Sequence, residues 1–129
     1  MRKRLLSLLL LSICGSMLFA QEPLDIDDVE QVPLGDFTYQ WRNIYDRTPL
    51  HGKCRIILSY RSYTIAHFNK DGILDGLYEK YEDNHLVQKL TYVKGILRGK
   101  GYEYYTDGTV KKECVWNEQG KIDGLMIEY

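Results

Sequence analysis

The chain is poor in proline, phenylalanine and cysteine, and it carries almost no net charge. Its 129 residues include 3 Pro, 3 Phe and 3 Cys, and 17 Lys and Arg stand against 18 Asp and Glu, which gives a formal charge of −1. This balance removes the electrostatic argument for nucleic-acid binding. Hydrophobic residues make up 44% and charged residues 27% of the chain, which argues against a disordered, collagenous or multi-span membrane protein. No segment shows a clean helical period.

Tyrosine and glycine are abundant instead. The chain has 11 of each, and many tyrosines and glycines with little proline favour short strands joined by glycine turns. Every tyrosine follows residue 38, and nine of the glycines lie at or after Gly52.

Residues 1–20 have the three parts of a secretory signal peptide. A basic start at residues 2–4 precedes an apolar run at 5–13, and Ala20 is the expected cleavage position. The apolar run is too short for a spanning helix. An alternative is a lipoprotein acylated at Cys14, although Ile13 stands where a small residue is expected. We predict a secreted or periplasmic cell-envelope protein whose mature chain has no integral membrane span.

Removal of the signal takes away Arg2, Lys3 and Arg4 and no acidic residue, so 14 Lys and Arg face 18 Asp and Glu, a charge of −4. We expect residues 21–36 to be an acidic flexible lead-in and residues 37–129 to be one repeat domain. Phe37, Tyr39 and Trp41 alternate and indicate a cap strand, because a repeat array needs atypical ends.

Four segments follow one pattern at a nearly constant interval along the chain. Each has a shared glycine, at Gly52, Gly76, Gly99 and Gly124, and three of the segments have another glycine four positions earlier. A fixed period in the range of about 20–50 residues indicates a repeat architecture. The glycines expected in turns are Gly52, Gly72, Gly76, Gly95, Gly99, Gly108, Gly120 and Gly124. Large apolar residues recur at a constant interval as well, at Ile44, Phe68, Tyr92 and Trp116.

Each repeat has the pattern of a β-hairpin. Residues 100–105 are rich in aromatics, Thr106-Asp107-Gly108 supplies a turn, and residues 109–116 return. An Asp-Gly pair between two such runs is a strong hairpin signal. The return strands alternate, which puts one mainly apolar row on one face. We predict an all-β fold, an antiparallel β-hairpin repeat array that forms a single meandering sheet, open or curled, of about eight strands.

The mature chain keeps Cys54 and Cys114, and an exported pair of cysteines invites a disulfide. The predicted strand order places them five strands apart, about 24 Å at ~4.8 Å per strand. A disulfide needs Cα atoms within about 7 Å. We therefore expect two thiols rather than a bridge, unless the sheet closes on itself.

No pattern for catalysis or metal binding stands out in the mature sequence. The histidines His51, His67 and His85 are widely separated, without the close spacing of a helical zinc motif. Four aspartates directly precede glycines, where turn chemistry explains them. These are Asp71, Asp75, Asp107 and Asp123. We expect no catalytic residue, no cofactor and no metal.

The glycine pairs with their following tyrosines resemble a known family. Gly72-x3-Gly76 with Tyr81, Gly95-x3-Gly99 with Tyr104, and Gly120-x3-Gly124 with Tyr129 are similar to the repeats of the MORN-repeat-variant family, the YwqK-type, antitoxin-like repeat proteins. The resemblance covers about residues 44–129. It implies a β-hairpin array that acts as a binding or scaffolding module without catalytic residues.

Tyrosines on the repeated strands form the candidate binding surface. They are Tyr78, Tyr81, Tyr102, Tyr104, Tyr105 and Tyr129. Cross-strand aromatic pairs stabilise sheets, but an exposed tyrosine row also suits peptide or glycan binding. The apolar face of the sheet needs cover, which the curl of the sheet, the segment 21–48 or a partner could supply. The last strand, residues 125–129, leaves an edge that could accept another strand.

We therefore predict an exported, non-enzymatic repeat protein that binds or scaffolds a protein or a cell-envelope component. A toxin-neutralising, antitoxin-like protein is the alternative. A small envelope hydrolase is a further one, and it would need carboxylates or histidines that meet in one pocket.

Overall fold

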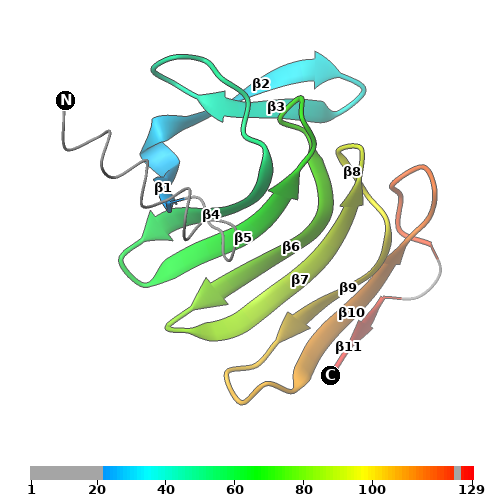
Figure 1. Cartoon of the computed structure of the whole chain (residues 1–129). Helices are drawn as coiled ribbons and strands as arrows, with labels where there is room; N and C mark the ends of the chain where they lie inside the picture. The colour runs from blue at the N-terminus through cyan, green and yellow to red at the C-terminus, as the bar shows by residue number, and fades with distance from the viewer. Residues whose placement is uncertain (1–21, 124–125) are drawn as a thin grey trace, which may run out of the picture.

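The computed structural model describes residues 22–123 and 126–129, and these residues are mostly in β-strands (Figure 1). The predicted signal peptide 1–20, Cys14 and Gly124 lie outside the described residues. In chain order the elements are β1 (Leu24–Asp25), the 3-10 helix η1 (Ile26–Asp28), β2 (Val29–Gly35), β3 (Thr38–Asn43), β4 (Gly52–Ser59), β5 (Ser62–Phe68), β6 (Leu74–Glu82), β7 (His85–Val93), β8 (Ile96–Leu97), β9 (Gly99–Tyr104), β10 (Val110–Trp116) and β11 (Ile127–Glu128). The described residues contain no helix long and apolar enough to cross a membrane.

The strands form one large open sheet and one small hairpin sheet. The large sheet has the order β1-β4-β5-β6-β7-β9-β10-β11, with β8 paired to β7. All its pairs are antiparallel except β1 with β4, where Leu24 and Asp25 lie parallel to Ile56 and Ile57. The predicted antiparallel hairpin array of about eight strands is confirmed. The prediction of a single sheet is wrong in one respect, because β2 and β3 pair only with each other.

The predicted flexible lead-in is structured. Most of the segment 21–36 forms β1, η1 and β2. Its acidic residues alternate with apolar ones, and Leu24, Ile26 and Val29 contact the buried core. The apolar side chains were the signal for an ordered segment, because burying each one removes hydrophobic surface from water.

The turns form as their sequences predict. Between β6 and β7, Asp83 and Asn84 both have positive φ, 50° and 64°, as a two-residue type I′ hairpin turn requires. Between β9 and β10, the Asp107 carboxylate accepts the Thr109 N–H at 2.9 Å. Seven of the eight predicted turn glycines have positive φ, which fits bends that an L side chain rarely adopts. They are Gly52, Gly72, Gly76, Gly95, Gly99, Gly108 and Gly120.

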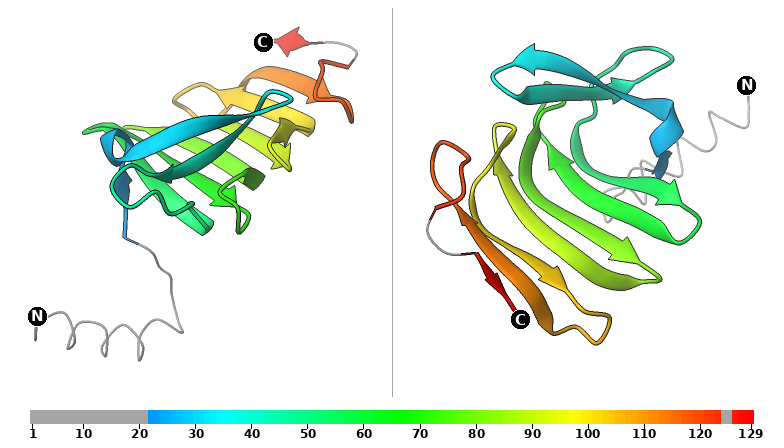
Figure 2. Two further views of the ribbon diagram at one scale, coloured as in Figure 1. Left: turned by 90° about the horizontal axis from the view of Figure 1, so that it is seen from above. Right: turned by 180° about the vertical axis from the view of Figure 1, so that it is seen from behind.

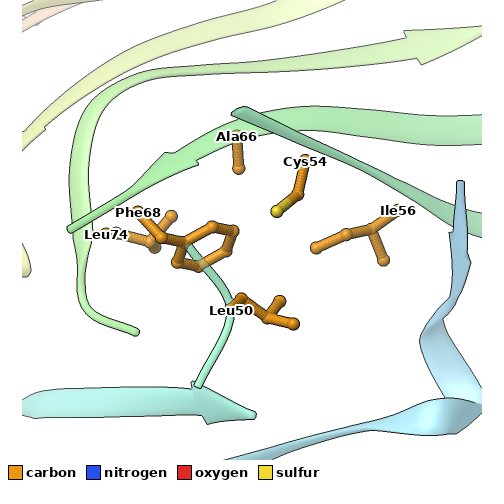
Figure 3. Close-up of a cluster of buried hydrophobic side chains, with 6 residues drawn as sticks. All are labelled: Leu50, Cys54, Ile56, Ala66, Phe68 and Leu74. Carbon is orange, nitrogen blue, oxygen red and sulfur yellow. The ribbon is translucent and has the colours of Figure 1, made fainter. Parts of the chain in front are cut away.

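The core lies on one face of β4, β5 and β6, which we call the inner face (Figure 3). The buried cluster consists of Leu50, Cys54, Ile56, Ala66, Phe68 and Leu74. Alternate residues of β4 and β5 supply it, as the pattern of the return strands predicts. The side chains one residue out of phase point to the opposite, outer face.

The β2–β3 hairpin covers the inner face at one end of the sheet, where it crosses the strand ends (Figures 1 and 2). The Trp41 N–H donates to the Gly72 carbonyl at 2.7 Å, and the Leu50 N–H donates to the Trp41 carbonyl at 2.9 Å. The Trp41 ring lies 5.5 Å from that of Phe68. We considered three possible covers for the apolar face. The segment 21–48 is the one that covers it at the first repeat.

Cys54 and Cys114 lie far apart in the strand order. Cys54 is on β4 and Cys114 on β10, both are buried, and no disulfide joins them. Burial raises the pKa of the Cys54 thiol, and a hydrogen bond with the His51 backbone lowers it by less. The open sheet keeps the thiols on separate strands, as expected.

Candidate functional site

The structure divides the six predicted tyrosines among three places. Tyr78 lies on the inner face, three others lie on the outer face, and Tyr105 and Tyr129 lie near the last hairpin. The three on the outer face are Tyr81, Tyr102 and Tyr104, as the strand register shows. The predicted set is therefore not one surface.

Tyr78 is part of the inner face. Its ring meets the Tyr92 ring edge-on, with centroids 6.0 Å apart and planes at 69°. Burial raises the pKa of Tyr78, and a hydrogen bond with the buried Thr64 lowers it by less. The Tyr78 hydroxyl thus gives a buried polar group its partner, which is a structural role.

Stacked aromatic rings mark the outer face. Tyr63 on β5 lies directly opposite Tyr81 on β6, and their rings stack with centroids 5.0 Å apart and planes at 13°. The guanidinium of Arg55 lies over the Tyr63 ring, 4.0 Å from its centroid. Arg55, Tyr63 and Tyr81 therefore form a row across β4, β5 and β6.

A second pair of rings continues the outer face on β9. Tyr102 and Tyr104 stack with centroids 6.0 Å apart. In the register, Glu79 lies opposite Lys89, and Lys89 lies opposite Tyr102. After burial, the negative charge of Glu79 helps to raise the pKa of Tyr81. The same charge helps to raise the pKa of Tyr104, after burial and Tyr102.

We call this set the outer tyrosine face. It consists of Arg55, Tyr63, Glu79, Tyr81, Lys89, Tyr102 and Tyr104. Tyrosine hydroxyls are protonated at neutral pH and can donate hydrogen bonds, and the raised pKa values of Tyr81 and Tyr104 extend this state to higher pH. Aromatic rings with polar tips beside an arginine are the chemistry enriched in protein interfaces.

Sequence reasoning missed Arg55 and Tyr63. Both occupy positions out of phase with the buried residues of their strands, so alternation alone could have placed them outside. Their association with Tyr81 depends on the β5–β6 register, which a bulge shifts between Ala66 and Phe68. The repeat spacing carries no signal for that bulge.

Tyr105 and Tyr129 hold the end of the chain. The Tyr105 hydroxyl donates to the Tyr129 carbonyl at 2.6 Å. The Tyr129 N–H donates to the Lys111 carbonyl at 2.7 Å. These bonds fix β11 against β10, so the two tyrosines serve the edge rather than the outer tyrosine face.

The inner face carries a groove beyond the β2–β3 hairpin. One part, of about 620 Å³, lies between the hairpin and the residues around β8 and Gly120. A second part, of about 250 Å³, lies over β7, β9 and β10 and ends at Ile122 and Met126. Leu97 lines both parts, so we treat them as one inner groove.

The titratable residues that could suggest catalysis have turn or strand contacts. The Asp75 carboxylate accepts the Lys94 N–H at 3.2 Å. Side-chain and backbone hydrogen bonds from Thr109 lower the pKa of Asp107. A ring nitrogen of His67 lies 3.0 Å from the Leu77 carbonyl. Across residues 22–123 and 126–129, no three His, Cys, Asp or Glu side chains gather as a metal site.

Comparisons with known proteins leave the family open. No family model matches the chain, and no curated protein matches it. One solved structure, described as TarM, aligns with 78% of this chain at 13% identity and a TM-score of 0.42. A second, an S. aureus TarM variant in complex with fondaparinux, alpha-GlcNAc-glycerol and UDP, aligns with 74% at 13% identity and a TM-score of 0.29. The chain spans only 21% and 16% of the length of these two proteins.

Proposed function

We propose that this chain is an exported, non-enzymatic binding module whose outer tyrosine face docks a protein partner of the cell envelope. The observation that carries the proposal is the row of Arg55, Tyr63 and Tyr81 on the outer face, with its 4.0 Å cation–π contact and 5.0 Å ring stack. The stack holds the side chains in one arrangement before a partner arrives. Less side-chain entropy is then lost on binding.

The charges on this face favour a protein over a nucleic acid. Lys89 lies opposite Glu79, and Arg55 lies two strands from Glu79 in the same cross-strand row, so the face presents both signs instead of the basic stripe that phosphates require. Mixed charges around aromatic residues give orientation and specificity to a protein contact. The engagement of Asp75 and Asp107 in turns also favours binding over catalysis.

Site-directed photocrosslinking in cells that produce the chain tests the proposal. A benzoylphenylalanine replaces Tyr81 in one variant and Tyr60 in a matched control, since Tyr60 is 92% exposed on the β4–β5 turn. We expect a discrete adduct from position 81 and none from position 60. Adding Arg55→Glu to the first variant should abolish the adduct, because it replaces the cation that lies over the Tyr63 ring with a negative charge.

The isolated partner then allows a quantitative check. Tyr63→Ser should raise its dissociation constant at least about tenfold, the effect typical of a residue central to an interface. Adducts of equal yield from positions 81 and 60 would contradict the proposal. So would a partner whose affinity changes less than about twofold in both Arg55→Glu and Tyr63→Ser.

A further inference from the structure

The inner face is covered in the first repeat and less covered in the later repeats. Phe68 in the first repeat is buried against Trp41. Its equivalents in the next two repeats, Tyr92 and Trp116, are only half-buried. Beyond Trp116, Ile122 is 53% exposed. The same face is therefore closed at one end of the array and open at the other.

The length of the β2–β3 hairpin explains the difference. β3 forms a hydrogen bond with the first repeat turn at Gly72. It also lies against the second repeat turn, because a Cβ added at Gly95 would meet the Thr38 methyl at 2.9 Å. The hairpin then reverses at residues 35–37. It ends before the third equivalent turn, at Gly120, so the third repeat has no counterpart of Trp41.

The tip of the hairpin is itself apolar and uncovered. Phe37 is 96% exposed and Leu34 is 50% exposed, and Phe37 lies at the rim of the inner groove. Large apolar side chains this exposed at the end of a hairpin indicate a contact with another molecule. Asp36 at the tip and Lys121 border the same part of the groove within one chain.

We propose that the chain forms a two-fold dimer in which the hairpin tip of each copy, residues 34–37, enters the inner groove of the other over Trp116 and Ile122. One molecule carries both halves of this contact, and a two-fold axis pairs such halves reciprocally. The tip then covers the third repeat as Trp41 covers the first. The tip of the second copy thereby extends the contact that the β2–β3 hairpin already makes with the inner face of its own chain. The outer tyrosine face takes no part in this contact.

Sedimentation velocity of the mature chain, residues 21–129, tests the dimer. We expect a concentration-dependent species of twice the monomer mass. Phe37→Asp in the tip and Ile122→Asp in the groove should each raise the dimer dissociation constant more than about tenfold, because each puts a charge into a desolvated contact. Both positions are exposed in one chain, so each variant keeps the monomer fold, which circular dichroism verifies. Tyr60→Asp, an equally exposed aromatic elsewhere, should leave the dimer unchanged.

A mixture of the two variants separates this arrangement from other dimers. A heterodimer of Phe37→Asp and Ile122→Asp chains retains one intact tip in one intact groove, so the mixture should dimerise more strongly than either variant alone. A wild-type chain that stays monomeric at about 100 µM, well above ordinary dimer dissociation constants, overturns the proposal. A Phe37→Asp chain that dimerises like wild type, or a mixture without recovery, overturns it too. None of these results depends on the crosslinking at Tyr81.

Discussion

Two turn glycines separate the effect of backbone conformation from that of close contact. Gly72 and Gly108 have φ values of 77° and 91°, so both resist an L side chain. A Cβ on Gly72 would also meet the Trp41 carbonyl oxygen at 2.5 Å, whereas a Cβ on Gly108 meets nothing within 4 Å. We expect Gly108→Ala to cost about 1 kcal/mol and Gly72→Ala about 3 kcal/mol in unfolding free energy. Urea denaturation measures both changes in unfolding free energy. Equal changes would show that the backbone at Trp41 moves freely to make room for a Cβ at Gly72.

The half-buried tyrosines of the inner face make the unfolding free energy depend on pH in the alkaline range. Burial raises the pKa of Tyr78 and of Tyr92 above the ordinary value of 10.0. Their contribution to stability is therefore complete below pH 10, and it is lost as the pH rises through the folded-state values, because the unfolded chain releases these protons first. We expect the unfolding free energy to fall above about pH 10. Tyr78→Phe should make that fall shallower in urea titrations at pH 8 and 11, while Tyr60→Phe should leave it as in wild type.

At the scale of elements, the cap strand β3 stabilises the first repeat. Trp41 joins it to the sheet through the 2.7 Å bond to Gly72 and the ring contact with Phe68. We expect Trp41→Ala to lower the unfolding free energy by about 2–4 kcal/mol, the cost of removing a large, partly buried aromatic. Tyr60→Ala, at an exposed turn, should change it by less than about 0.5 kcal/mol. Urea denaturation measures both effects. Equal effects of the two substitutions would mean that β3 does not stabilise the sheet.

The repeat spacing predicted the hairpins because each one is specified locally. Asp83-Asn84 and Asp107-Gly108 set their turns within a few residues, and the alternation of β5, β7 and β10 set their faces. The parallel pairing of β1 with β4 was beyond such reasoning. It joins Leu24 to Ile56 across the whole β2–β3 hairpin, and nothing in either segment specifies the other.

The candidate site was predicted only in part, because the repeat specifies turns and alternation locally but does not specify the pairing of distant strands. Tyr81, Tyr102 and Tyr104 follow from the repeat. Alternation along the strand puts Tyr78, three positions before Tyr81, on the opposite face, and the grouping of all six tyrosines as one surface overlooked this. Tyr63 lies outside the repeated tyrosine position and joins the face only through its stack with Tyr81. Strand register, including its bulges, decides these contacts, and a one-residue change of register exchanges the two faces.

At the scale of the whole molecule, the two proposed contacts lie on opposite faces of the sheet. The inner face is apolar and half covered by the β2–β3 hairpin, and a second copy would cover the rest. The outer face is aromatic and charged along its length. A two-fold dimer through the inner grooves would leave both outer tyrosine faces exposed, so each dimer would offer two equivalent binding faces.

The predicted export of the chain can be tested together with the position of β1. Cleavage after Ala20 would remove the predicted signal peptide and leave β1 whole, because β1 begins at Leu24. We expect the exported protein to begin at Gln21, which intact-mass spectrometry of the envelope fraction checks. Replacing Ala20 with tyrosine should block cleavage, since signal peptidase sites need a small residue there, and should accumulate the longer chain. Cys14→Ser should change nothing. A Cys14→Ser chain that is no longer processed, or a mature protein that begins at an acylated Cys14, would identify a lipoprotein instead.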